Sequence, residues 1–257
     1  MFTKRLTKII EEINDFQNIN GNSYFVYRGQ SESSWNLRPS LFVKMLQKKL
    51  TKQEIVTIEN NLYFDFTINA KGILESSQKS WQTLFQMRHI GLPTRILDWT
   101  ENLNMAIYFS VYGQGTSPCI WVLDAHKLNQ IALSNEDIPN PLDPNDEIID
   151  YKEAFLPKNS SVDAPNFYKL PFAMVAPRMS DRIFAQRGLF TVQTSGDKMI
   201  DQIAQLKGCV KQIKLLDSDT TIDMVKDYLK IMGINHFTVY PDFEGLRLYL
   251  MEEHELD

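Results

Sequence analysis

Apolar residues recur along the chain at two spacings, one typical of helices and one typical of strands. The helical spacing predicts an N-terminal amphipathic helix over residues 3–17, within a segment 1–20. The same spacing predicts helices over about 52–70, 78–90 and 104–112, then over 219–232 and 243–252. Pro39, suited to a first helical turn, opens another helix that runs through Leu46.

Strand-like runs separate these helices. Tyr24 to Arg28 is aromatic and β-branched and ends at Gly29, and Cys119 to Asp124 has no polar face, which predicts a central strand. Further strands are expected at 172–175, 188–192, 210–215 and 236–239. The chain is therefore expected to form one α+β domain, a central mixed sheet flanked by helices, with its core at about 24–250.

Residues 126–169 break the pattern. They hold many prolines, and between Asn135 and Glu153 there are seven acidic residues against one lysine. Low apolar content predicts a loop-rich excursion rather than a separate domain. A lid and a partner-docking segment remain alternatives for it.

Composition narrows the function classes. The net charge of −5 disfavours non-specific binding to nucleic acid without excluding it, and Lys44, Lys48, Lys49 and Lys52 are the lysines from which a basic groove would form. Cys119 and Cys209 lie in apolar segments, which favours a reducing compartment. The chain shows neither a signal peptide nor an apolar run of about 18 residues, so a cytoplasmic protein without membrane contact is expected.

Familiar enzyme motifs do not occur in the sequence. It contains no phosphate-cradling glycine loop and no Gly-x-Ser-x-Gly elbow. Its four histidines are scattered, and none forms a metal-binding pair on a helix, so no metal is expected.

Two clusters in the first half of the chain carry candidate chemistry. Arg28 closes a strand and can present a guanidinium to a phosphate or carboxylate, with Gly29 allowing close approach and Gln30 beside it; a structural salt bridge is the alternative. In the stretch 86–100, Arg95 and Asp98 either order a loop by pairing or belong to a pocket. That pocket would include Thr94, Asp98 and Thr100, with Trp99 as a stacking wall.

Two clusters follow in the second half. Arg178 and Arg182 are four residues apart, a spacing that suits either anion capture or a solvated helix face, and Gln186 precedes a glycine turn. Asp242 and Glu244 stand before a helix; Asp242 is expected to cap it, and Glu244 is the candidate catalytic acid.

In this order the clusters resemble the FRG domain family. The matching segments are Tyr27-Arg-Gly-Gln30, Trp35-Asn-Leu-Arg-Pro-Ser-Leu41, Gly91-Leu-Pro-Thr-Arg-Ile-Leu-Asp-Trp-Thr100, Ala106-Ile-Tyr-Phe109, Ile120-Trp-Val-Leu123, Gln186-Arg-Gly-Leu-Phe190 and Pro241-Asp-Phe-Glu-Gly245. The resemblance loosely implies a role in conflict between bacteria and phages, as a toxin or defence protein. A cognate regulator or antitoxin is then an expected partner.

A more distant resemblance is to arginine-type ADP-ribosyltransferases, and it implies NAD as substrate. Carried over, Arg28 would hold the pyrophosphate, Thr100 or Thr94 would support the ribose, and Glu244 would stabilise the oxocarbenium-like transition state. Trp99, Tyr108 or Phe190 would stack on nicotinamide, and the acceptor is undetermined. The chain departs from that pattern because it lacks a Ser-Thr-Ser run and places Glu244 in a turn. A non-catalytic nucleotide or phospho-ligand sensor and a nucleic-acid-acting enzyme are the alternatives.

Overall fold

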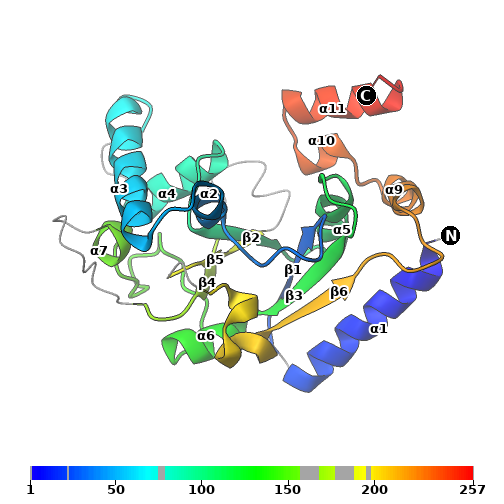
Figure 1. The fold of residues 1–257 in the computed structure, drawn as a ribbon, viewed down its shortest axis with the longest axis horizontal. Helices are drawn as coiled ribbons and strands as arrows, with labels where there is room; N and C mark the ends of the chain where they lie inside the picture. The colour runs from blue at the N-terminus through cyan, green and yellow to red at the C-terminus, as the bar shows by residue number, and fades with distance from the viewer. Residues whose placement is uncertain are drawn as a thin grey trace.

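One six-stranded sheet forms the centre of the molecule (Figure 1). The computed structural model describes residues 2–21, 23–74, 79–156, 168–176, 188–194 and 198–256. The strands are β1 Phe25–Gln30, β2 Ile96–Thr100, β3 Cys119–Asp124, β4 Phe172–Val175, β5 Gly188–Val192 and β6 Val210–Lys214, in the spatial order β4-β5-β2-β1-β3-β6. These strands pair antiparallel throughout. The α+β prediction is confirmed, but the prediction of a mixed sheet is wrong, since the described strands are all antiparallel. The apolar pattern of a strand does not indicate the direction in which it pairs.

Helices surround this sheet. They are α1 Thr3–Asn20, α2 Ser40–Lys48, α3 Lys52–Asn69, α4 Ser80–His89, α5 Leu103–Val111, α6 Ala125–Leu133, α7 Tyr151–Phe155, α9 Ile222–Ile231, α10 His236–Val239 and α11 Phe243–Glu253, with 3-10 turns η1 Ile200–Gln202 and η2 Ala204–Cys209. Each of the seven helices predicted from the sequence is confirmed, with ends within a few residues. Their periodic apolar residues mark the faces that pack on the sheet.

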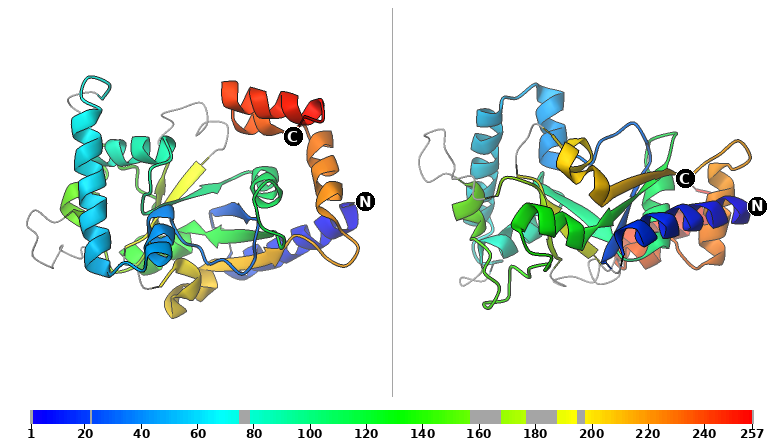
Figure 2. Two further views of the ribbon diagram at one scale, coloured as in Figure 1. Left: turned by 45° about the horizontal axis from the view of Figure 1, so that its top comes forward. Right: turned by 90° about the horizontal axis from the view of Figure 1, so that it is seen from below.

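The helices cover the sheet unevenly (Figures 1 and 2). On one face, α1, α5 and α9 pack over β1, β3 and β6, while α3, α4 and α7 pack over β2, β4 and β5. The opposite face carries a third apolar cluster, which includes residues of α6 and the two 3-10 turns. Two helical groups therefore share one face and leave a division between them.

Residues 236–239 form helix α10, so the strand predicted there is wrong. Asn235 is the reason: its side chain accepts a hydrogen bond from the Thr238 N–H at 2.9 Å and caps the turn. A cap of this kind outweighs the β-propensity of the short run Phe237-Thr-Val239.

The acidic segment is more structured than its composition suggests. It begins with α6, which Asp124 caps by accepting from the Lys127 N–H at 2.9 Å. Its second helix, α7, buries Tyr151 and Phe155 against Trp81 of α4. A few aromatic residues anchor this stretch to the core, so a loop-rich excursion is an incomplete description of it.

Strand β2 was not foreseen, because the stretch 86–100 was interpreted as a turn with charged residues. Leu97 and Trp99 lie in the third apolar cluster, whereas Asp98 and Thr100 alternate to the other face. None of the described helices combines the length and the apolar character that crossing a membrane requires.

Candidate functional site

The central strands β1 and β2 separate soon after they meet. They pair at one register position, Tyr27 opposite Thr100, whereas β1 pairs with β3 along its whole length. Beyond Tyr27, the side chain of Arg28 enters the gap, and its Nη1 donates to the main-chain oxygen of Asp98 at 2.7 Å. An arginine thus takes the place of a ladder hydrogen bond where the two strands fork.

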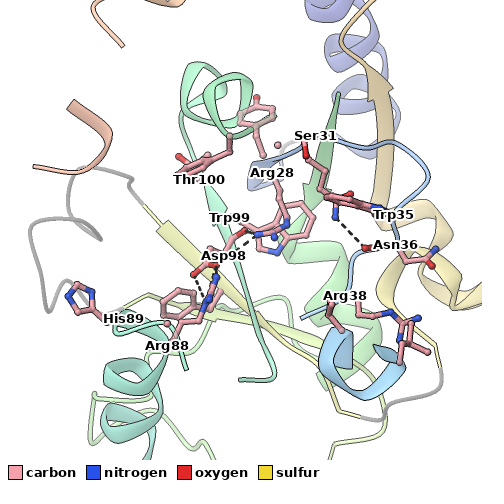
Figure 3. A pocket seen from close by; sticks show the side chains of 18 of the residues that line it. Arg28, Ser31, Trp35, Asn36, Arg38, Arg88, His89, Asp98, Trp99 and Thr100 are labelled. Carbon is pink, nitrogen blue, oxygen red and sulfur yellow. Dashed lines mark hydrogen bonds and ion pairs between the residues drawn. The ribbon is translucent and has the colours of Figure 1, made fainter. Parts of the chain in front are cut away.

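A cavity of about 980 Å³ opens at this fork. Its wall comes from β1, the following loop 31–38, helix α2, the end of α4, strand β2, and single residues of α5, β5 and the segment after α10. Figure 3 shows Arg88 and Asp98 on one side, Trp35 and Arg38 on the other, and Arg28 between them. The cavity therefore lies between the two groups of helices, and residues far apart in sequence line it.

Gly29 is required by packing at this place. A Cβ atom on Gly29 would lie 1.8 Å from the Ala106 oxygen and 2.7 Å from the Ser110 nitrogen, both in the backbone of α5. Helix α5 therefore rests directly on β1. This contact accounts for the glycine after Arg28 without any ligand.

Asp98 is the centre of the charged network in the pocket. Arg88 donates to its carboxylate through Nη2 and through Nε, the latter at 3.2 Å, and Arg28 Nη1 lies 4.0 Å from Oδ2. Burial would raise the pKa of the Asp98 carboxyl, but Arg88 and Arg28 outweigh it and hold that pKa below its ordinary value. Asp98 raises the pKa of Arg88 against the opposing effect of burial, so this pair is ionised at neutral pH.

Positive charge exceeds negative charge in the lining. Arg28, Arg38 and Arg88 contribute guanidinium groups, against the single carboxylate of Asp98 among the described lining residues. The Nε atom of Arg28 is buried without a hydrogen-bond partner. Within the described part of the chain, the guanidinium of Arg38 has neither a hydrogen-bond nor an ion-pair partner. Donors without acceptors at a cavity wall favour an anionic ligand.

The structure divides the residues proposed from the sequence. Those that line the cavity are Arg28, Gly29, Gln30, Asp98, Trp99, Thr100 and Phe190. The amide of Gln30 is occupied, because it donates to the Asn36 oxygen at 3.2 Å and accepts from Trp121 Nε1 at 2.7 Å. Trp99 is 2% exposed and donates its indole N–H to Thr191, so it presents little surface for stacking.

Three expected pocket residues lie elsewhere. Arg95 is sealed in the core, where it pairs with Glu59 rather than with Asp98. Thr94 is buried where its N–H donates to Ser40 Oγ at 3.1 Å, and the Tyr108 hydroxyl bonds to His236 Nδ1 at 2.5 Å beneath α10. Thr94 and Arg95 precede β2, and none of these three residues lines the cavity at the fork.

Glu244 also lies outside the cavity lining. It is exposed on α11 and accepts from Arg247 at 2.7 and 3.0 Å, so the structure does not bring it to Arg28. Asp242 accepts from the Gly245 N–H at 2.9 Å, which confirms it as the cap of α11. Arg178, Arg182 and Gln186 lie outside the described residues.

Several lining residues were not among those proposed. They include Ser31, Trp35, Arg38, Arg88, Phe109 and Tyr240. Trp35 and Arg38 stand within the Trp-Asn-Leu-Arg-Pro segment already matched to the family, which was a usable signal. Tyr240 directly precedes the matched segment Pro241–Gly245, but only the turn between α10 and α11 brings it to the pocket. Among the described residues, no three histidine, cysteine or acidic side chains gather as metal ligands would.

Comparison with known proteins bears on the same part of the chain. Residues 23–117 match the FRG domain family, and this stretch contains β1, the loop 31–38, α2, α4 and β2, which build most of the cavity wall. No curated protein and no solved structure matches the chain. The family resemblance seen in the sequence is thereby confirmed over residues 23–117, the stretch in which the chain carries an FRG domain.

Proposed function

We propose that the cavity at the β1–β2 fork binds a phosphorylated small molecule, such as a nucleotide, and that Arg28 is its principal anion contact. The observation that carries this proposal is the excess of guanidinium groups around Arg28, whose buried Nε–H has no acceptor. A phosphate group in the cavity would be held by the guanidinium groups of Arg28 and Arg88. The chain as a whole is acidic, so this cationic lining is a local feature.

Calorimetric titration with inorganic pyrophosphate tests this proposal. We expect wild-type protein to bind it and Arg28→Ala to weaken binding by about tenfold or more, the loss of a charge-assisted hydrogen bond. Arg247→Ala is the matched control, because Arg247 is an ion-paired arginine outside the cavity lining. If wild-type protein does not bind pyrophosphate, or if the two variants behave alike, the proposal is wrong.

NAD cleavage is the second candidate, and one observation favours it. Asp98 is an ionised carboxylate in the same cavity as Arg28, so it can stabilise positive charge at a ribose whose phosphates Arg28 holds. The bond between ribose C1′ and nicotinamide nitrogen would break with its electron pair leaving on nicotinamide, and water or an acceptor would add to C1′. Asp98 would then have the role that the ADP-ribosyltransferase resemblance assigned to Glu244. Such an activity would suit a toxin or defence protein.

Nicotinamide release from NAD separates the two candidates. A catalytic site predicts release by wild-type protein that Arg28→Ala and Asp98→Asn abolish and that Glu244→Gln leaves intact. Binding of pyrophosphate without any release supports a binding module alone. Loss of release in Glu244→Gln would contradict the assignment to Asp98.

A further inference from the structure

Trp35 differs from the other tryptophans of the chain. Trp81, Trp99 and Trp121 are at most 7% exposed, whereas Trp35 is 51% exposed, and its side chain lines the cavity on the side away from Arg88 (Figure 3). An indole ring left in water at a cavity wall offers a face for stacking.

Helix α2 extends this apolar wall. Val43 and Leu46 are three residues apart, so they project from one face of the helix, and both line the cavity while they remain 36% and 58% exposed. Leu41 and Phe42, in the first turn of the same helix, are buried in the core. Together with Trp35, these side chains form an apolar patch beside Arg38, in a pocket that carries Arg28 and Arg88 further along its wall.

The loop that carries Trp35 is held in place from both sides. Asp201 accepts from Asn36 Nδ2 at 2.8 Å and from the Leu37 N–H at 3.0 Å. Before the tryptophan, the Ser33 N–H donates to the Ser117 oxygen at 2.7 Å, and Gln212 Nε2 donates to the Ser33 oxygen at 2.8 Å. The backbone on both sides of Trp35 is thus held by the fold, so a ligand ring would meet an indole carried on an ordered loop.

We infer that the ligand of this pocket is a nucleotide whose base stacks on Trp35, against Val43 and Leu46, while its phosphate is held at Arg28 and Arg88. This inference rests on the proposed anion-binding function. It adds the chemical class of the part of the ligand that carries no phosphate, which is an aromatic base. A planar ring uses the exposed indole face and the apolar patch, which an inorganic phosphate leaves in water. Trp35 is then the residue that selects nucleotides over simple phosphates.

The test compares AMP with ribose 5-phosphate, because the two share phosphate and ribose and differ by the base. Titrations of full-length wild-type protein should show AMP binding more tightly, by about 5- to 150-fold, the range of base–aromatic stacking. Trp35→Ala should remove this preference and leave the affinity for ribose 5-phosphate unchanged. Trp35→Phe should keep most of it.

Phe243→Ala is the control for loss of an exposed ring, since Phe243 is 90% exposed and lies outside the cavity lining. Equal affinities of wild-type protein for AMP and ribose 5-phosphate would overturn the inference while leaving the anion site in place. Equal weakening of both ligands by Trp35→Ala would also overturn it, by showing a structural role. Absence of binding of either ligand would overturn the proposed function itself. If Trp35→Ala does not fold, Leu46→Ser tests the same wall.

Discussion

Two arginine–carboxylate clusters meet the chain at neighbouring positions, Arg95 and Asp98, yet one is sealed in the core and the other lines the cavity. In the first, Arg95 and Glu59 have side chains only 4% and 3% exposed. In the second, Arg28, Arg88 and Asp98 surround the cavity with side chains 23%, 29% and 37% exposed. Strand β2 contributes Asp98 to the open cluster, and Arg95, directly before β2, belongs to the sealed one.

The clusters differ in how fully their donors are used. Arg95 donates to Glu59 and to the Gln193 and Thr194 oxygens at 2.6 and 3.1 Å, while Tyr151 donates to Glu59 at 2.6 Å. The guanidinium of Arg95 also stacks 4.2 Å from the Phe155 ring centre. Because the donors of Arg95 are used in this way, its guanidinium links α3, α7 and the end of β5. Arg28 keeps a donor without a partner and lines an open cavity, so its guanidinium can bind a ligand.

The largest effect is expected in the sealed cluster. Glu59→Gln should lower the free energy of unfolding by about 3–5 kcal/mol, because it leaves Arg95 as a buried charge without a counterion. Urea denaturation at neutral pH measures this loss. The double variant Glu59→Leu with Arg95→Met should recover much of it, since well-packed apolar residues can replace a buried ion pair. A loss below about 1 kcal/mol would show that water reaches the cluster.

A smaller stability effect is expected in the open cluster. Arg88→Ala should lower the free energy of unfolding by about 1 kcal/mol or less, because solvent already screens this pair. Its affinity for pyrophosphate should nevertheless fall by about tenfold, by the loss of a guanidinium from the anion site. If Arg88→Ala destabilises the protein as much as Glu59→Gln, the distinction between the two clusters fails.

Acid should act on the open cluster in a defined direction. The pKa of Asp98 is held below its ordinary value of 3.8, so its ion pairs stabilise the fold above that value and the contribution is lost as pH falls through the folded pKa. The difference in unfolding free energy between wild-type protein and Asp98→Asn should therefore shrink below about pH 5. Urea titrations at a series of pH values test this. A difference that grows in acid would mean that the pKa is raised.

The smallest effect is expected at Glu244 and Arg247. Their pair is solvent-exposed on α11, so Glu244→Gln should leave the midpoint of urea unfolding and the affinity for pyrophosphate unchanged. The same titrations measure both quantities. Weaker pyrophosphate binding by this variant would place Glu244 in the site and contradict the geometry described above.

Sequence reasoning identified the elements better than their contacts. The helices α1, α2, α3, α4, α5, α9 and α11 and the strands β1, β3, β4, β5 and β6 were predicted from the sequence, but α6, α7 and α10 were not. Arg28, Asp98 and Thr100 were expected in a pocket that does contain them. One of the two interpretations paired Asp98 with Arg95, three residues away, but Arg88 from the end of α4 takes that place. Proximity in sequence is a poor guide here, because Arg95 turns into the core beside Glu59.

By itself, the sequence determined the α+β class, the FRG resemblance and the Arg-Gly pair at the end of β1. Local spacing and backbone preference suffice for the fold class and for the end of β1, whereas the FRG resemblance rests on the order of the matched motifs. Only the tertiary structure decided which arginine is sealed and which is open, and that Trp35 faces the same cavity as Arg28. Those facts depend on where β1 and β2 diverge and on how two groups of helices divide one face of the sheet. Both are set by packing between residues far apart in the chain.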